Sequence, residues 1–401
     1  MKKITLIILI ALQLSCNNKD SKQAISLYKA IGKSKPVEIK IDVSESSTYR
    51  IPEDLFDEPT FVKLETANNN LIGKISQVIF HNNLIIVVDN TISNSINVFD
   101  MNGKFKNKIG KPGQGPGEYI SCHHVAKVPD KDIIAVLDDK LAKVHYYKID
   151  GEYMNSVKFD FSTTDMEFIN PEQIAFVGLN NKELNNNDLI ITDPKNKVLS
   201  AGFKGLYKEN KFTYSNVKRM SKYGNTVFFN PNYNDTIFEI GDKNIQARYH
   251  IDIVKHKFPK INDKTTDADM DAYYKKYITF NGDFFEFEKA ALFYISVPNS
   301  TSPFAIYSKE LKETYKWNLQ SYNPFYIFLS MGEPNARFKN NTLVYSVPAQ
   351  HVILAKKIFD EKVERYHISK SKVDELFNGL SEEDNPVLFF YNINIKKQNL
   401  K

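Results

Sequence analysis

Three aspartates in this sequence have a type and position suited to ligand chemistry. Asp89, Asp138 and Asp139 each stand at the end of an apolar, strand-like run. Carboxylates gathered on one loop face could bind a cation or a sugar hydroxyl. An aspartate at a strand end also accepts hydrogen bonds from its own turn, and we favour this structural role for all three.

Two adjacent histidines, His123 and His124, are the natural candidates for a metal site. Neighbouring residues of an extended strand point to opposite faces, so the two imidazoles would rarely share one ion. No further acid or histidine stands at metal-ligand spacing around them. We therefore expect no metal site and no cofactor. No ordered set of serine, histidine and aspartate argues for a catalytic nucleophile.

A glycine-rich run over residues 110–117 could aim backbone amides at a phosphate. A phosphate-binding loop would need a following Lys-Ser or Lys-Thr and then a helix, and the run has neither. Residues 32–34 read Gly-Lys-Ser, but Leu27 stands where the first glycine of a nucleotide loop belongs. An ordinary connection between strands is the better interpretation of the run at 110–117.

Aromatic residues offer a different chemistry. The chain has 22 Tyr and 28 Phe but one Trp. Most of these rings should fill the space between sheets. We expect Tyr119, Tyr233 and Tyr322 to lie on loops, where they could stack on a sugar ring or hold a peptide.

The elements that must position these residues repeat along the chain. Residues 97–105 and 145–153 are near-copies that lie 48 residues apart, and each copy has an apolar strand on either side of a turn. A period of this size is typical of a β-propeller blade. Five strand pairs follow the pattern: 84–89 with 95–100, 133–138 with 143–148, 173–178 with 188–193, 226–229 with 236–240, and 291–297 with 303–308.

A sixth blade needs strands from both ends of the chain. Residues 342–347 begin it, and we take residues 386–391 as its second strand. The spare strand at residues 61–65 would then complete this blade and close the ring. Helical spacing of apolar residues indicates two insertions, at about 258–285 and 349–383. The sequence thus predicts an all-β fold: a six-bladed β-propeller over residues 37–401 with two short helical insertions.

The N-terminus has the features of an export signal. A basic start, Met1-Lys2-Lys3, precedes an apolar run that is too short to span a bilayer. Ser15 and Cys16 follow, so residues 1–15 resemble a bacterial lipoprotein signal peptide with Cys16 as the lipid attachment site. Gln13 departs from the usual signal box. Residues 16–36 are mostly polar and are interpreted as a tether.

The charge distribution and the number of cysteines argue against a nucleic-acid partner and against an internal disulfide. The formal net charge is +5, with Lys and Arg interleaved with Asp and Glu, so nucleic acid is not an expected partner. Once the signal peptide is removed and Cys16 carries a lipid, Cys122 is the only remaining thiol. One thiol cannot form an internal disulfide, and we expect Cys122 to act as a small buried apolar residue.

The chain resembles the six-bladed β-propeller lipoproteins of Bacteroidota, whose blades are similar to NHL repeats. The resemblance covers nearly the whole mature chain and is carried by residues 61–66, 98–100 with 103–105, 109–110 with 113–119, 233–237 and 384–388. These motifs are architectural. The resemblance implies the fold, and it supplies no catalytic residues.

Three functions are compatible with this reading. We expect a lipid-anchored propeller of the cell envelope, held in the outer membrane, that binds a protein, peptide or glycan through a loop face. A hydrolase or lyase with a site near the central channel is an alternative. A structural subunit of a surface complex, using the two insertions as its interface, is another.

Overall fold

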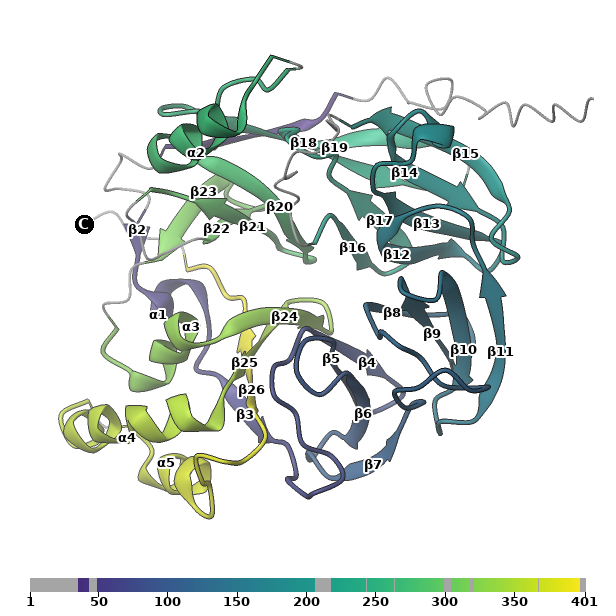
Figure 1. Cartoon of the computed structure of the whole chain (residues 1–401). Coiled ribbons are helices and arrows are strands. Elements are labelled where there is room, and N and C mark those ends of the chain that lie inside the picture. Colours follow the sequence, from purple (N-terminus) through teal and green to yellow (C-terminus); the bar gives the residue numbers. More distant parts are fainter. Residues whose placement is uncertain are drawn as a thin grey trace, which may run out of the picture.

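The computed structural model describes residues 35–42, 49–205, 218–242, 244–262, 264–298, 304–317, 321–366 and 368–396. The expected signal peptide, Cys16 and most of the tether lie outside these residues. Within them, six sheets stand around a common centre as a six-bladed β-propeller, which confirms the predicted fold (Figure 1).

Blades 1 to 3 are four-stranded antiparallel sheets whose first strand is innermost (Figure 1). Their second and third strands match the predicted pairs to within one residue. Blade 1 is β4 (Gln77–His81), β5 (Leu84–Asp89), β6 (Ser95–Asp100) and β7 (Phe105–Lys108); blade 2 is β8 (His124–Lys127), β9 (Ile133–Asp138), β10 (Lys143–Lys148) and β11 (Tyr153–Lys158); blade 3 is β12 (Thr163–Asn170), β13 (Gln173–Gly178), β14 (Asn187–Thr192) and β15 (Val198–Lys204).

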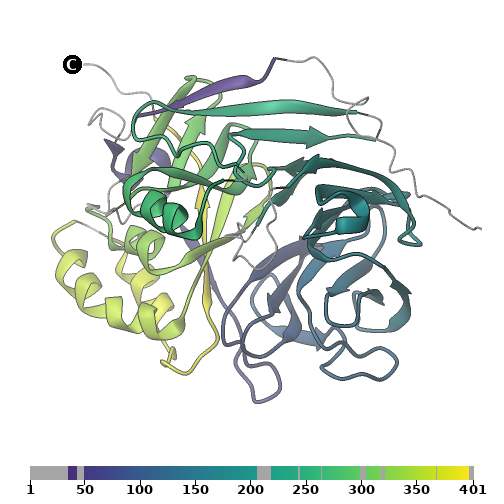
Figure 2. The same cartoon turned by 45° about the horizontal axis from the view of Figure 1, so that its top comes forward.

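Blades 4 and 5 each gain a fifth strand that the sequence analysis did not anticipate. Blade 4 is β16 (Met220–Tyr223), β17 (Thr226–Phe229), β18 (Thr236–Ile240) and β19 (Ile245–Ile253), with β1 (Val37–Ile41) parallel to β19; blade 5 is β20 (Thr279–Glu286), β21 (Ala290–Ser296), β22 (Phe304–Ser308) and β23 (Glu313–Trp317), with β2 (Tyr49–Arg50) parallel to β23. In the tilted view of Figure 2, purple β1 lies along the outer edge of the ring.

Blade 6 closes the ring as predicted. It contains β24 (Glu333–Phe338), β25 (Thr342–Val347) and β26 (Val387–Asn392), and β3 (Thr60–Lys63) pairs antiparallel with β26 as its outermost strand. Strand β3 and the last described strand, β26, therefore share one sheet, so the hydrogen bonds of blade 6 hold the ring shut.

The repeated glycines of the near-copies have a specific role in joining blades. Gly103 and Gly151 both adopt positive φ, +81° and +95°. A Cβ on Gly103 would lie 2.0 Å from the carbonyl oxygen of Lys63, and one on Gly151 would lie 2.4 Å from that of Lys108. Lys63 ends β3 and Lys108 ends β7, so each glycine lets a hairpin touch the outermost strand of the preceding blade.

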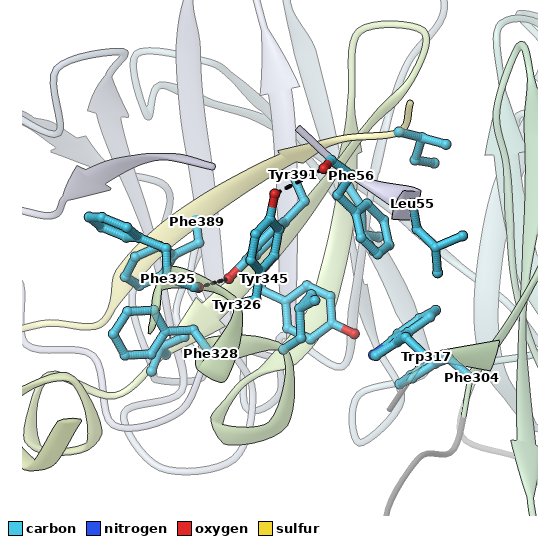
Figure 3. Packing of buried hydrophobic residues seen from close by; sticks show 14 of the residues in the cluster. Leu55, Phe56, Phe304, Trp317, Phe325, Tyr326, Phe328, Tyr345, Phe389 and Tyr391 are labelled. Carbon is cyan, nitrogen blue, oxygen red and sulfur yellow. Dashed lines mark hydrogen bonds between the residues drawn. The ribbon is translucent and has the colours of Figure 1, made fainter. Parts of the chain in front are cut away.

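Aromatic packing fills the wedge between blades 5 and 6 (Figure 3). Phe328 stacks on Phe389 with ring centroids 4.3 Å apart, and Phe56 meets Trp317 edge-on at 5.5 Å. The hydroxyl of Tyr391 donates to the carbonyl oxygen of Phe325 at 2.8 Å, so this buried phenol has a partner.

The helices lie in connections between strands and cover part of one side of the ring. They are α2 (Asp267–Lys276), η4 (Pro324–Ile327), α3 (Phe328–Met331), α4 (Ala349–Val363) and α5 (Lys370–Phe377), besides the short α1 (Pro52–Leu55) before β3 and η3 (Lys182–Leu184) in blade 3. The first insertion is shorter than the expected 258–285, because β20 begins at Thr279 and its alternating Phe280 and Phe284 are needed in the core. Both α4 and α5 lie within 349–383.

Antiparallel blades place their connections alternately on two faces. We call one the loop face: it holds the connections between blades and those between the second and third strands of a blade. Its described parts include residues 64–76, 90–94, 109–123, 139–142, 254–278 and 348–386. The opposite hairpin face holds short turns, such as residues 82–83, 101–104 and 224–225.

Candidate binding face

Exposed apolar side chains concentrate on the loop face. Among the described residues, 11 large apolar side chains are exposed. Seven of them lie in loop-face connections: Leu71, Ile92, Ile120, Val254, Tyr322, Leu354 and Tyr366. A surface that carries most of the exposed large apolar side chains of a protein is a candidate for binding. The loop face is therefore the candidate binding surface.

Asp89 is a structural residue, as the sequence analysis favoured. Its carboxylate is fully buried and accepts backbone N–H bonds from Gly73, Lys74, Thr91, Ile92 and Ser93 at 2.8–3.1 Å. Burial alone would raise the pKa of Asp89, but these bonds outweigh it and hold the pKa below its ordinary value. The carboxylate fixes two loops, 64–76 and 90–94, against each other.

Asp138 repeats this arrangement in blade 2. Its buried carboxylate accepts the N–H groups of Ile120, Lys140 and Leu141 at 2.7–3.0 Å. Asp139 is different: it lies partly exposed, 3.2 Å from the Lys140 ammonium and 3.8 Å from Nδ1 of His123. Asp138 thus closes its own turn and holds the preceding loop, while Asp139 is partly exposed and pairs with Lys140.

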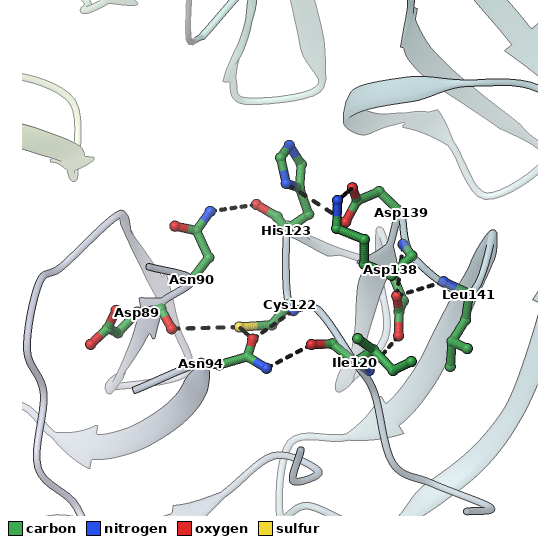
Figure 4. Close-up of polar contacts among 10 residues, drawn as sticks. Asp89, Asn90, Asn94, Ile120, Cys122, His123, Asp138, Asp139 and Leu141 are labelled. Atoms are coloured by element: carbon green, nitrogen blue, oxygen red, sulfur yellow. Dashed lines mark hydrogen bonds and ion pairs between the residues drawn. The ribbon is translucent and has the colours of Figure 1, made fainter. Parts of the chain in front are cut away.

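Cys122 and Asn94 complete this polar framework (Figure 4). The Asn94 amide donates to the Ile120 carbonyl at 2.8 Å and accepts from the Cys122 N–H at 3.1 Å. The Cys122 thiol is fully buried, as expected, and burial raises its pKa to about 12. Loops 90–94 and 109–123 are therefore locked together beneath their exposed side chains.

The glycine-rich run is an ordinary loop that satisfies its own amides. The Glu118 carboxylate accepts the Gly115 N–H at 2.8 Å and lies 3.1 Å from the Lys111 ammonium. A carboxylate of the chain itself thus occupies the position that a phosphate would need.

The three tyrosines expected on loops have different surroundings. Tyr119 is buried, with 1% of its surface exposed, so the expectation of a free ring there was wrong. Tyr233 stacks on Phe258 with centroids 6.3 Å apart, which places its ring in a small cluster under α2. Tyr322 is 61% exposed and meets Tyr366 at 5.5 Å. Of the three, Tyr322 alone has its ring largely open to a ligand.

The innermost strands carry polar contacts from blade to blade around the channel. Gln77 of β4 bonds the backbone of Val125 in β8 twice, at 2.7 Å and 3.1 Å. Nδ1 of His124 in β8 lies 2.9 Å from the Asp165 carboxylate of β12. Burial alone would lower the pKa of His124, but the charge and hydrogen bond of Asp165 outweigh it and raise the pKa above its ordinary value.

Two further charged groups lie in the same part of the channel. The ammonium of Lys222 in β16 donates to the Phe168 carbonyl of β12 at 2.6 Å. Burial lowers the pKa of Lys222 and raises that of Glu167, although the attraction between the two groups opposes both shifts. Over the ranges that the structure describes, no three His, Cys, Asp or Glu side chains converge as metal ligands.

Comparison with known proteins agrees with this architecture. The family model described as "Domain of unknown function (DUF4934)" matches residues 37–392. The chain belongs to this family. No curated protein matches the sequence of this DUF4934 member. Among its described helices, none combines the length and apolar character needed to cross a bilayer.

One solved structure shows the same fold at low sequence identity. A putative exported protein from Bacteroides fragilis has 21% identity and a TM-score of 0.70 over 90% of this chain and 100% of that one. A DUF4221 family member from Bacteroides vulgatus has 10% identity and a TM-score of 0.48, over 86% and 98% of the two chains. Virginiamycin B lyase from Staphylococcus aureus has 12% identity and a TM-score of 0.38, over 72% and 81%. The first shows the propeller fold of DUF4934, and the other two are too distant to support an argument.

Sequence reasoning missed the channel residues, although a signal for them exists. Gln77, His124 and Asp165 lie opposite Val88, Leu137 and Val177, each of which directly precedes the last residue of a second strand. They therefore hold equivalent places in three blades. Aligning the short innermost strands by this register would have brought them together.

Proposed function

We propose that the chain is a lipid-anchored protein of the cell envelope that binds a protein, peptide or glycan through its loop face. The carrying observation is the concentration of exposed apolar side chains and helices on that face, above loops that buried carboxylates hold in place. Rigid loops lower the ordering cost of binding, because little freedom remains to be lost.

The channel supports this assignment by what its polar groups already contact. Asp165 has His124 as a partner, and Lys222 has the Phe168 carbonyl. The Arg337 guanidinium donates to the Lys339 carbonyl at 2.5 Å and lies over the Tyr223 ring. The contacts of Asp165, Lys222 and Arg337 with residues of other blades fit a structural role between blades.

The start of the domain supports an orientation. β1 runs parallel to β19, so the chain enters β1 from the side of the hairpin face. A tether from lipid-modified Cys16 in the outer membrane would then join the propeller on the side opposite the loop face. In this arrangement the loop face points away from the membrane and is open to a partner.

Two experiments test the proposal. Cys16→Ala should move the protein from the membrane fraction to the soluble fraction, and retention in the membrane would defeat the anchor. For binding, biotin is attached through Lys104→Cys on the hairpin face or Ile92→Cys on the loop face, and native envelope extract is applied. Capture of a stoichiometric ligand by the first and not by the second variant supports the loop face, whereas equal capture or none refutes it.

A further inference from the structure

One part of the loop face presents a purely aliphatic surface. Leu71, Ile92 and Ile120 are 50%, 69% and 38% exposed, and they come from three consecutive loop-face connections beside blade 1. We call these three side chains the aliphatic ridge. Elsewhere on the face the exposed apolar side chains include tyrosines, such as Tyr322 and Tyr366.

The aliphatic ridge rests on a built foundation. Asp89 accepts hydrogen bonds from the backbone of loop 64–76 and from that of loop 90–94. Ile92 lies directly against Gly73: a Cβ added to Gly73 would be 2.4 Å from the Cγ2 atom of Ile92. Asn94 ties the backbone of Ile120 to the same loop (Figure 4). The ridge is thus held rigid by buried polar groups while its apolar ends face outward.

The charges beside the ridge are not symmetrical. Toward blade 2, the Lys111 and Lys140 side chains are 72% and 64% exposed, whereas their partners Glu118 and Asp139 are 24% and 21% exposed. Cations therefore dominate the surface on that side. Toward blade 6, the exposed charged residues include Glu382 and Glu383, which precede the buried Asn385 that bonds Ile72, and they outnumber the exposed Lys74 of loop 64–76.

We propose that the aliphatic ridge binds a segment of a partner protein that carries aliphatic side chains and has its acidic residues directed toward blade 2. This inference rests on the proposed function and specifies its ligand. Branched aliphatic side chains pack against other aliphatic groups but offer no flat face on which a sugar ring can stack. An apolar centre with a charged rim is the usual construction of a protein interface. The exposed lysines complement acidic residues in the partner.

The test uses the full-length chain in its native cells with a benzophenone amino acid placed at one position. The positions are Ile92 and Ile120 on the ridge, Leu354 elsewhere on the loop face, and Met154 on the outer strand of blade 2. Leu354 is a matched control, because its exposure of 68% equals that of Ile92 within one per cent. Adducts formed on illumination are identified by mass spectrometry and mapped to a segment.

The expected result is an adduct from positions 92 and 120 with one protein, at a segment containing aliphatic and acidic residues. A synthetic peptide of that segment should bind the purified protein, and Ile92→Ser should weaken binding about tenfold or more. Leu71→Ser is a second ridge variant and should weaken binding as well. Lys140→Gln should reduce the salt dependence of binding. An unchanged midpoint of thermal unfolding shows that each variant folds.

Other outcomes overturn the inference in distinguishable ways. An adduct from position 354 without one from 92 or 120 removes the ridge but leaves loop-face binding standing. An adduct with a second copy of this chain, or with a glycan or lipid alone, replaces the proposed partner. Equal adducts from position 154 show non-specific contact. No adduct from any loop-face position counts against the proposed function as well.

Discussion

Nδ1 of His124 lies 2.9 Å from the carboxylate of Asp165, and this contact joins blade 2 to blade 3 on the channel side. Glu167 and Lys218 also influence His124, the first favouring and the second opposing its protonation. The pair connects strands that are distant in the sequence, and its strength depends on a proton.

Replacing Asp165 with Asn should therefore destabilise the protein in a pH-dependent way. The folded pKa of His124 is raised, so its stabilising contribution is complete below the unfolded value of about 6.5 and is lost as the pH rises through the folded pKa. The difference in free energy of unfolding between wild type and Asp165→Asn should be larger at pH 6 than at pH 9. Urea denaturation at both pH values measures it, and a constant difference would contradict the role of the imidazolium.

Asp89→Asn should lower the free energy of unfolding by about 2–4 kcal/mol at neutral pH. The new side-chain NH2 group is a donor, so backbone N–H groups of two loops would lose their acceptor. The pKa of Asp89 is depressed, so its contribution is present above about pH 4 and declines as the pH falls through the folded pKa. Asp139→Asn is the control at a partly exposed carboxylate paired with Lys140, and it should cost less than about 1 kcal/mol. Similar losses for the two variants in chemical denaturation would refute this difference.

Gly103→Ala should destabilise the ring closure by about 3 kcal/mol or more. Two effects contribute. The new methyl group would clash with the Lys63 carbonyl of β3, and alanine is strained at the positive φ of this position. Gly224→Ala isolates the second effect, because Gly224 has φ of +59° and no atom within 4 Å of its added Cβ, so about 1 kcal/mol is expected. Equal midpoints in thermal unfolding would show that the contact with Lys63 is unimportant.

The thiol of Cys122 should not react with iodoacetamide at pH 8 in the folded protein. The side chain is fully buried, and burial raises its pKa to about 12, so little thiolate is present. A Cys16→Ser background leaves Cys122 as the single thiol to follow by mass spectrometry. Labelling should begin only in denaturant. Rapid labelling of the native protein would mean that loops 90–94 and 109–123 open readily.

The fold could be predicted further than the site. The turn glycines at 103 and 151 and the apolar strands around them repeat in the sequence, because blades 1 and 2 make the same contact with the outermost strand of the preceding blade. Strand β1 lacks such a signal: residues 37–41 alternate as any strand does, and nothing local identifies β19 as their partner. Tyr119 failed as a free aromatic because a loop can still bury a ring beneath itself. Contacts between blades, such as that of His124 with Asp165, depend on register across sheets and are invisible to local patterns.

The parallel pairing of β1 with β19 has a mechanical consequence. Five consecutive residues, Val37 to Ile41, are paired along the strand. A pull on Val37 away from the hairpin face acts along the strand axis, so it loads these hydrogen bonds together in shear and does not peel them apart one at a time. A force applied to this end of the domain would pass into blade 4 as a load shared by these bonds. The ring would resist extraction better than it would with a strand attached at right angles to the force.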